Sequence, residues 1–510
     1  MDDSDYRFPD PVRQGIAADV GNSATELGSA LLENFASRGS LPVNLLDYAT
    51  ADATDQTAHV QAAIDAVPTG GTLTVPAGVV FRVDGELVLS KAMTISSPGR
   101  GGFYSQIAGT TAQRMLRITS GDTHLRGLLL TGPQRTSAAD QYGVHITGAS
   151  STAQIESVTV VGCELTNFAY AGVFAQHVKR IKIDGNRIHD IAYAGIMVAS
   201  CIDGSIDDND VWNITQAGYV NSYGITASRT PGSLIDSPRS TGLSISSNRV
   251  TGVPLWAGID THGGQGLLIS KNIIRDTGTA ISLVSAQNAA MAYVFAPLDM
   301  EIADNLIDST VTNGTRGAGI NLSGNATQQA SGKIHGNTVR GHGLQSAGAG
   351  AGIYLENTLG AVVTANTVIE PAPSGINAYT NNVGFVISHN IVVDQWSNSV
   401  NTKAVNCQLG SNSGYVGENT ALANGKTATY TVANGFGVFV ANQTNNAIML
   451  GANRMAATVT ALYDPGAKSG IGFLGAPAAA KAASPGTATG TDAAVINAVS
   501  TALRNYGLIN

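Results

Sequence analysis

One short phrase recurs through the middle of the chain and restricts what the chain can fold into. It reads apolar, any residue, apolar, two residues, Asn, any residue, apolar, as in IKIDGNRI, SISSNRV and VISHNIV. The asparagines, separated by 23 to 39 residues, are Asn186, Asn209, Asn248, Asn272, Asn305, Asn337, Asn366 and Asn390, with Asn419 next. A fixed strand core with variable insertions at an inexact interval is typical of a parallel β-solenoid.

A second phrase, Gly followed by an apolar residue, lies midway between successive asparagines. It reads AGVFAQH, AGIMVAS, YGITASR, AGIDTHG, AGINLSG, AGIYLEN and SGINAYT. Each repeat therefore has a strand before Asn, a strand after Asn and a strand that opens at Gly. Three sheets wound in this way predict an all-β, right-handed parallel β-helix, since parallel crossovers take that hand. We expect one Asn per coil to form a ladder, with the side chain bonded to neighbouring turns and the backbone in the left-handed region that Asn tolerates.

Composition excludes several other classes of protein. Gly accounts for 60 of the 510 residues and charged residues for only 13%, which suits turn-rich β structure. With 28 basic against 36 acidic residues, no basic stripe is available for nucleic acid. The three cysteines are too few and too scattered for a disulfide framework or a zinc site. We expect no metal, no cofactor and no insertion into a membrane.

The ends of the chain differ from its middle. Apolar residues spaced as on one side of a helix occur at 11–37 and again from Val495 to Leu503, and each stripe needs a partner. The stretch 476–490 is an Ala/Gly/Pro/Ser linker. The predicted division is a helical attachment segment (1–40), an N-terminal cap with the first coils (41–130), the β-helix with its groove (131–424), a C-terminal β region (425–475), and a linker with a short terminal helix (476–510).

The start of the solenoid resembles a known family. An amphipathic helix expected at Thr57–Val67 is followed by PTGGTLTVPAGVVF, which resembles the N-terminal cap of the pectate-lyase-like β-helix in phage tailspikes and minor tail proteins. The Gly-Asp-Gly-x-x-x-Asp-Asp run usual in such chains is replaced here by Ala51–Asp55. The resemblance covers roughly residues 40–420. It implies a homotrimer in a virion tail that acts on polysaccharide of the host cell surface, with its N-terminus bound to other tail proteins.

The resemblance also implies that substrate lies along the sheet that opens at Gly. Among the outward positions of that sheet, only Asp260, His262 and Glu356 carry a carboxylate or an imidazole. Asp260 and His262 are two residues apart on one strand, so both side chains point to the same side. We expect Asp260 to be exposed there.

Two long insertions bracket this strand, at 228–240 and 285–297, and predict a cleft with Asp260 and His262 at its floor. Tyr193, Tyr223 and Trp256 stand in the turns before the Gly strands. They are either a platform for sugar rings or an aromatic stack inside the solenoid. Arg229 lies in the first insertion, and Tyr354 and Glu356 mark an alternative stretch of groove further along.

Three functions fit these residues. A glycoside hydrolase would use Asp260 with Asp236 or Asp276 as acid and base or nucleophile, with His262 orienting a carboxyl group or binding sugar. A polysaccharide lyase would use His262 or Tyr354 as base and a cation such as Arg229 to neutralise a uronate. A tail protein that binds glycan without cleaving it is the third.

Overall fold

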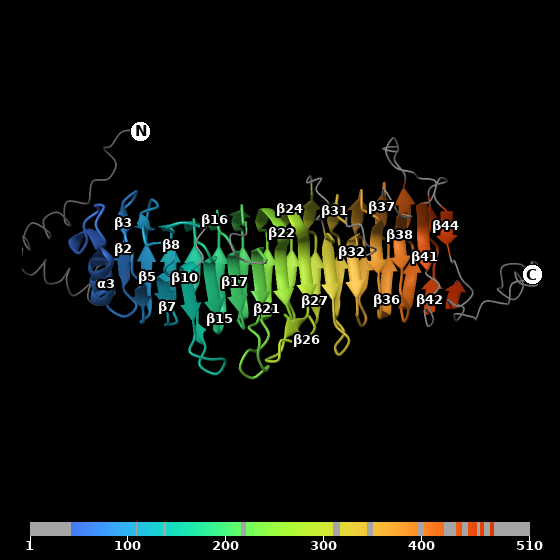
Figure 1. Ribbon diagram of the computed structural model, residues 1–510, viewed down its shortest axis with the longest axis horizontal. Helices are drawn as coiled ribbons and strands as arrows, with labels where there is room; N and C mark the ends of the chain where they lie inside the picture. Colours follow the sequence, from blue (N-terminus) through green and yellow to red (C-terminus); the bar gives the residue numbers. More distant parts are fainter. Residues whose placement is uncertain are drawn as a thin grey trace, which may run out of the picture.

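The computed structural model describes residues 42–473, except 109, 136–138, 216–220, 310–316, 344–349, 396–401, 423–434, 441–446, 456–459 and 464–469. The helices expected at 11–37 and near the C-terminus therefore lie outside the described residues. The described chain winds into stacked coils along one axis, with strands of successive coils side by side (Figure 1).

The N-terminal end of the stack is covered by the helix α3 (Thr57–Ala66), as the sequence predicted within one residue. Val60, Ala63 and Ile64 of this helix are buried in the same core as the first coils. A short 3-10 helix, η1 (Leu45–Asp47), precedes it. An uncapped solenoid would expose its core and its strand edges to solvent, and α3 covers both at this end.

Each coil contributes to three faces. The pre-Asn face holds the strands before each Asn position, the post-Asn face those after it, and the Gly face those that open at Gly. The pre-Asn face is a 17-stranded sheet made of β1 (Val43–Asn44), β2 (Thr72–Thr74), β5 (Met93–Ser96), β8 (Thr123–Arg126), β11 (Ile155–Glu156), β12 (Thr159–Val161), β15 (Val178–Asp184), β18 (Ile202–Asp207), β21 (Thr241–Ser246), β23 (Leu268–Ser270), β27 (Met300–Ala303), β30 (Gly332–His335), β33 (Val362–Thr364), β36 (Val383–Ser388), β39 (Ser413–Gly417), β42 (Ala447–Leu450) and β45 (Gly470–Phe473).

The other two faces join into one 26-stranded sheet, because β22 (Arg249–His262) and β24 (Ile273–Val284) run without a break from the post-Asn face onto the Gly face. The remaining post-Asn strands are β3 (Val80–Arg82), β6 (Gly102–Tyr104), β9 (Leu129–Thr131), β13 (Glu164–Thr166), β16 (Arg187–His189), β19 (Asp210–Trp212), β28 (Leu306–Asp308), β31 (Thr338–Arg340), β34 (Thr367–Ile369), β37 (Ile391–Val393), β40 (Thr420–Leu422) and β43 (Arg454–Met455). The remaining Gly-face strands are β4 (Leu87–Leu89), β7 (Gln113–Ile118), β10 (Gln141–Thr147), β14 (Ala171–Gln176), β17 (Ala194–Ala199), β20 (Tyr223–Ser228), β29 (Ile320–Ser323), β32 (Ala351–Glu356), β35 (Ser374–Ala378), β38 (Thr402–Cys407), β41 (Gly435–Val440) and β44 (Thr460–Tyr463).

The Asn ladder is confirmed, and it continues one coil further, to Asn453. The Nδ2 of Asn272 donates to Oδ1 of Asn305 at 2.9 Å and to the carbonyl of Ile245 at 2.9 Å, and the backbone N–H of Asn272 donates to the same Oδ1 at 3.0 Å. The same pattern repeats from Asn186 to Asn419. Our expectation for the backbone was wrong. The left-handed residue is the one before each Asn, such as Lys271 and Asp304. The ladder asparagines are not among the residues with a left-handed backbone, and their side chains are buried.

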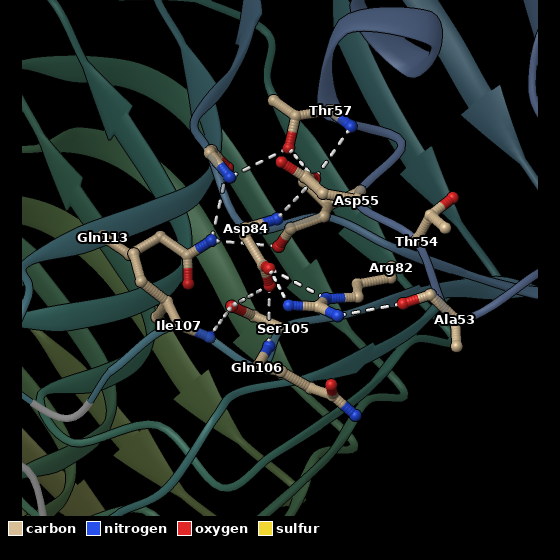
Figure 2. A network of polar contacts seen from close by, with 12 residues as sticks. Ala53, Thr54, Asp55, Thr57, Arg82, Asp84, Ser105, Gln106, Ile107 and Gln113 are labelled. Carbon is tan, nitrogen blue, oxygen red and sulfur yellow. Dashed lines mark hydrogen bonds and ion pairs between the residues drawn. The ribbon is translucent and has the colours of Figure 1, made fainter.

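A polar network ties the helical cap to the first coils (Figure 2). The carboxylate of Asp55 accepts from the backbone N–H of Thr57 at 3.0 Å and of Asp84 at 3.1 Å. The guanidinium of Arg82 bonds both the carboxylate of Asp84, at 2.8 Å from Nε, and the carbonyl of Ala53, at 2.9 Å. These contacts use Asp55 from the stretch that replaces the familiar acidic run upstream of the helix.

We expect Asn305→Ala to lower the thermal unfolding midpoint clearly. The substitution leaves two buried donors of Asn272 without an acceptor, and each such group costs about 1–3 kcal/mol. Leu306→Ala is the control, because Leu306 is the next residue and its side chain is 41% exposed. Equal midpoints for the two variants, measured by circular dichroism, would contradict a stabilising ladder.

Candidate functional site

A cleft lies on the Gly face between the two long insertions. The second insertion contains an antiparallel hairpin, β25 (Ala286–Gln287) and β26 (Tyr293–Phe295). The cavity measures about 320 Å³ and is lined by Tyr170, Phe174, Tyr193, Met197, Ala199, Asn221, Tyr223, Thr226, Ser228, Arg229, Thr230, Pro231, His262, Ala286, Gln287 and Tyr293. The structure thus brings His262, Arg229, Tyr193 and Tyr223 together at the place that loop lengths indicated.

Asp260 and His262 form a pair in this cleft. The Nε2 of His262 lies 3.3 Å from Oδ2 of Asp260, and the hydroxyl of Thr226, on the neighbouring strand, donates to the same oxygen at 3.2 Å. The imidazole is 24% exposed and lines the cleft, whereas the carboxylate beneath it is wholly buried. A ligand in the cleft therefore meets His262 and Thr226, and the Asp260 carboxylate lies behind these two side chains.

The predicted exposure of Asp260 was wrong, with consequences for its ionisation. Burial raises the pKa of the Asp260 carboxyl above its ordinary value, although His262 and the Thr226 hydroxyl act in the opposite direction. Alternation along the strand correctly aims Asp260 out of the solenoid. The sequence could not show that neighbouring side chains and loops close over it.

Two buried arginines hold the walls of the cleft in place. Arg229 donates to the carbonyls of Ser237 at 2.7 Å and Gln287 at 2.8 Å, so it joins the first insertion to the hairpin. Its Nη2 donates to two further carbonyls, and its guanidinium lies 4.4 Å from the centre of the Phe295 ring. Arg239 donates to the carbonyls of Gly263 and Ala296. Both guanidinium groups are engaged by the protein itself, although Arg229 borders the cavity.

The aromatic residues divide into two groups. Tyr170, Tyr193 and Tyr223 pack side by side, with ring centres 4.8 and 5.5 Å apart, and they form an apolar cluster separate from the interior core. The Tyr223 ring reaches His262 at 6.3 Å. Trp256 is 42% exposed and is not part of the core. The predicted stack exists, but it lies along the outer side of the Gly strands and borders the cleft.

A second cavity of about 580 Å³ continues along the same face. Its lining residues are Trp256, Thr279, Val284, Ser285, Tyr293, Gly317, Ala318, Asn321, Ser323, Gly324, Asn325, Tyr354 and Glu356. The Tyr354 hydroxyl donates to the Glu356 carboxylate at 3.1 Å. Tyr293 of the hairpin, which the sequence analysis did not single out, is 57% exposed and lines both cavities. The alternating aromatic stretch AYVF within a long insertion was the available signal.

The other two predicted carboxylates are not among the residues lining these cavities. Asp236 is exposed on the first insertion, where it accepts from the Ser233 hydroxyl at 2.7 Å. Asp276 stands in the bend between the two halves of β24, with a left-handed backbone. Within the described chain, no group of three or more His, Cys, Asp or Glu could hold a metal ion. Its helices include none that is long and apolar enough to cross a membrane.

Comparisons with known proteins agree on the fold. The family model "Right handed beta helix region" matches residues 135–293, and no curated protein matches the chain by sequence. The Agl-KA catalytic domain is similar over 81% of this chain and 68% of its own, at 13% identity and a TM-score of 0.54. PfbA, a surface adhesin of Streptococcus pneumoniae, is similar over 83% and 94%, at 11% identity and a TM-score of 0.51. The Dettilon tailspike protein is similar at 18% identity and a TM-score of 0.49. The match covers 68% of this chain, and this chain spans 66% of the tailspike's length. The predicted right-handed parallel β-helix is confirmed.

We expect Asp260→Asn to raise the melting temperature at pH 7. Because burial raises the pKa of this carboxyl, the folded state holds its proton more tightly than the unfolded state does. The stabilisation from that proton is complete below the ordinary Asp value of 3.8 and is lost as the pH rises toward the folded-state pKa. An amide does not ionise, so the variant avoids this loss.

Scanning calorimetry of wild type and Asp260→Asn from pH 3.5 to 8 tests this, with the exposed Asp203→Asn as control. The gain should shrink as the pH approaches 3.8. A lower melting temperature for Asp260→Asn at pH 7 would show that an ionised Asp260 stabilises the fold.

Proposed function

We propose that this protein cleaves a polysaccharide bound along the Gly face, with His262 as the acid–base residue and Asp260 as its positioning residue. The observation that carries the proposal is the buried carboxylate 3.3 Å from an imidazole that lines a cleft. A buried carboxylate fixes the orientation of a histidine and the distribution of its proton, which general acid–base catalysis requires. Since Nε2 is buried 3.3 Å from the Asp260 carboxylate, Nδ1 is the nitrogen left for a ligand.

The length of the lined face supports a polymer as the ligand. The two cavities extend over the Gly strands from β14 to β32, which are six coil steps of ~4.8 Å each. Tyr293 borders both cavities, and the rings of Tyr193, Tyr223 and Trp256 are spread along the same stretch. Concave surfaces with exposed rings and a few polar groups are the usual sites for such ligands.

Among cleavage reactions, hydrolysis suits this cleft better than β-elimination. A lyase would need a cation free to neutralise a uronate carboxylate, and the Arg229 guanidinium is already bonded to four backbone carbonyls. The Glu356 carboxylate in the second cavity would repel an anionic sugar. In hydrolysis, His262 would take a proton from the attacking water or give one to the oxygen that leaves the anomeric carbon.

The two-carboxylate arrangement of most glycosidases is not built from the residues lining these cavities. The Glu356 carboxylate is three coils from that of Asp260, about 14 Å by stacking, which exceeds the ~6.5–9.5 Å between the carboxyl groups of inverting enzymes. The favoured acid–base group is therefore the imidazole. Binding without cleavage is the second candidate, and the same experiment distinguishes it.

We expect His262→Ala to lower the cleavage rate by about 10²–10⁴-fold, the usual contribution of an acid–base residue. His335→Ala is a matched control, because the Nε2 of His335 also lies 3.3 Å from a carboxylate, that of Glu301, on the pre-Asn face. The assay incubates wild type and both variants with purified bacterial surface polysaccharides and follows new reducing ends and ultraviolet absorbance. Reducing ends without the absorbance of an unsaturated uronate indicate hydrolysis.

Reducing ends that carry that absorbance would replace hydrolysis by β-elimination. If wild type binds a polysaccharide and releases no product, the protein is a glycan-binding protein. Cleavage by His262→Ala at the wild-type rate would move the catalytic residues elsewhere.

We also propose that the protein works as a homotrimer in a phage tail, at the host cell surface, with its N-terminus attached to other tail proteins. This rests on the resemblance of the cap and on the apolar stripes at 11–37 and 495–503, which lie outside the described residues. A helix with such a stripe, as the sequence predicts at each end, needs a partner, and a second and third copy would supply it.

Light scattering of the full chain at micromolar concentration should give three times the chain mass of 52.1 kDa. A chain lacking 1–40 and 476–510 should give a smaller assembly if these segments hold the trimer together. A monomeric full chain would contradict the proposal and leave the cleft within one subunit.

A further inference from the structure

The second cavity on the Gly face differs from the cleft in its charge. Among the described residues that line it, Glu356 is the only charged one, whereas the cleft is lined by Arg229 and His262. The second cavity is also the larger, at about 580 Å³ against about 320 Å³ for the cleft. A polymer that lies along the face therefore meets a different chemical environment in each cavity.

The Glu356 carboxylate has a neutral partner and no cation beside it. The hydroxyl of Tyr354, two residues earlier on β32, donates to it at 3.1 Å. Burial and the neighbouring carboxylate raise the pKa of this hydroxyl, so it keeps its proton and directs it at Glu356. Within the described chain, no ion pair joins Glu356 to Lys, Arg or His, whereas Glu86, Glu156 and Glu164 all have arginine partners. The negative charge of Glu356 is therefore left for a ligand to compensate.

Glu356 stands in the same position as His262, three coils further along the face. Four outward residues follow one another in register on successive Gly strands, namely Asp260, Ser282, Asn321 and Tyr354. His262 stands two residues after the first of them and Glu356 two residues after the last. At ~4.8 Å per coil, Glu356 lies about 14 Å along the face from His262. A polymer that follows the face from the cleft therefore reaches Glu356.

The rest of the wall strengthens the effect of this one charge. Tyr293 and Tyr354 contribute aromatic rings to the cavity, and the faces of such rings attract cations. The nearby amide and hydroxyl groups are bonded to one another: Asn321 accepts from the Ser323 hydroxyl at 2.6 Å. A concave surface with apolar walls focuses the field of a charge at its edge and concentrates ions of opposite sign. The cavity therefore favours a cation over a neutral group and opposes an anion.

An organic ammonium group suits this wall better than a metal ion does. Calcium and magnesium take about six or more oxygen ligands, and the described lining residues include a single carboxylate. An ammonium group carries several N–H donors and forms strong charge-assisted hydrogen bonds with one carboxylate. Because the Gly face is the proposed polysaccharide site, the ammonium group belongs to a sugar.

We propose that the second cavity binds an amino sugar unit of the polysaccharide, with its amine free and charged, and that Glu356 determines this specificity. The inference rests on the proposed function, since it names a unit of the polymer that is cleaved at His262. Tyr354 is the positioning residue, because its hydroxyl holds the Glu356 carboxylate.

Saturation-transfer NMR of the full chain at pH 6 compares glucosamine with glucose, galactosamine with galactose, and mannosamine with mannose. In each pair an ammonium group replaces one hydroxyl, so the comparison isolates the charge. We expect at least one amino sugar to bind about tenfold more tightly than its neutral partner, the usual effect of a hydrogen bond to a charged group. Glu356→Gln keeps the size of the side chain and should abolish that difference. Glu301→Gln, the same change on the pre-Asn face, should leave it as in wild type.

Three results would overturn the inference: no binding by any of the six sugars, equal binding within every pair, or an amino-sugar preference that Glu356→Gln leaves unchanged. The cleavage assay is judged separately. Cleavage of an uncharged polysaccharide without an amino-sugar preference would keep the proposed function and reject this inference. A Glu356-dependent preference in a protein that cleaves nothing would keep this specificity as that of a glycan-binding protein.

Discussion

The hydrogen bonds that hold one coil to the next determine the rest of this structure. Along the strands the backbone supplies them, and at one corner the Asn ladder continues them through buried side chains, each of which bonds the following Asn and a carbonyl of an earlier strand. Buried amides of this kind stabilise the fold only when all their hydrogen bonds are made. Successive coils must therefore keep the same spacing and register at the Asn corner. The ladder therefore keeps the coils in register, while the other two corners are free to carry insertions of different length.

The candidate site follows from that division. Long insertions emerge at the corner after the Gly strands, which is a different corner from the one that carries the ladder. The strand between the two insertions ends in a tight Gly263–Gly264 turn. Arg229 and Arg239 donate hydrogen bonds to backbone carbonyls of these insertions. The walls of the cleft are therefore held in place by buried guanidinium groups and not by an apolar core. An interior that is uniform along the stack can thus carry cavities where these insertions rise from its surface.

At the level of the cleft, Asp260 is the residue whose ionisation costs the folded state free energy. The strand directs its carboxylate out of the solenoid, but neighbouring groups cover it, so burial disfavours the ionised form. Gln113 and Gln141, in successive coils near the N-terminal end of the Gly face, show a milder version, each with one buried amide oxygen left without a partner. Buried groups of this kind destabilise the folded state, and they occur preferentially where a protein binds a ligand or catalyses a reaction.

The sequence by itself determined the architecture, because the spacing of Asn and Gly repeats the periodicity of the coil and alternation along each strand decides which side chains point outward. It also located the cleft, since insertion length marks where the surface rises, and it placed helix α3. Only the tertiary structure decided the burial of Asp260, the separation of Asp236 and Asp276 from the cavities, the engagement of Arg229 and the position of Tyr293. These properties depend on how loops from different coils fold over one another, and pairings of that kind leave no periodic pattern in the chain.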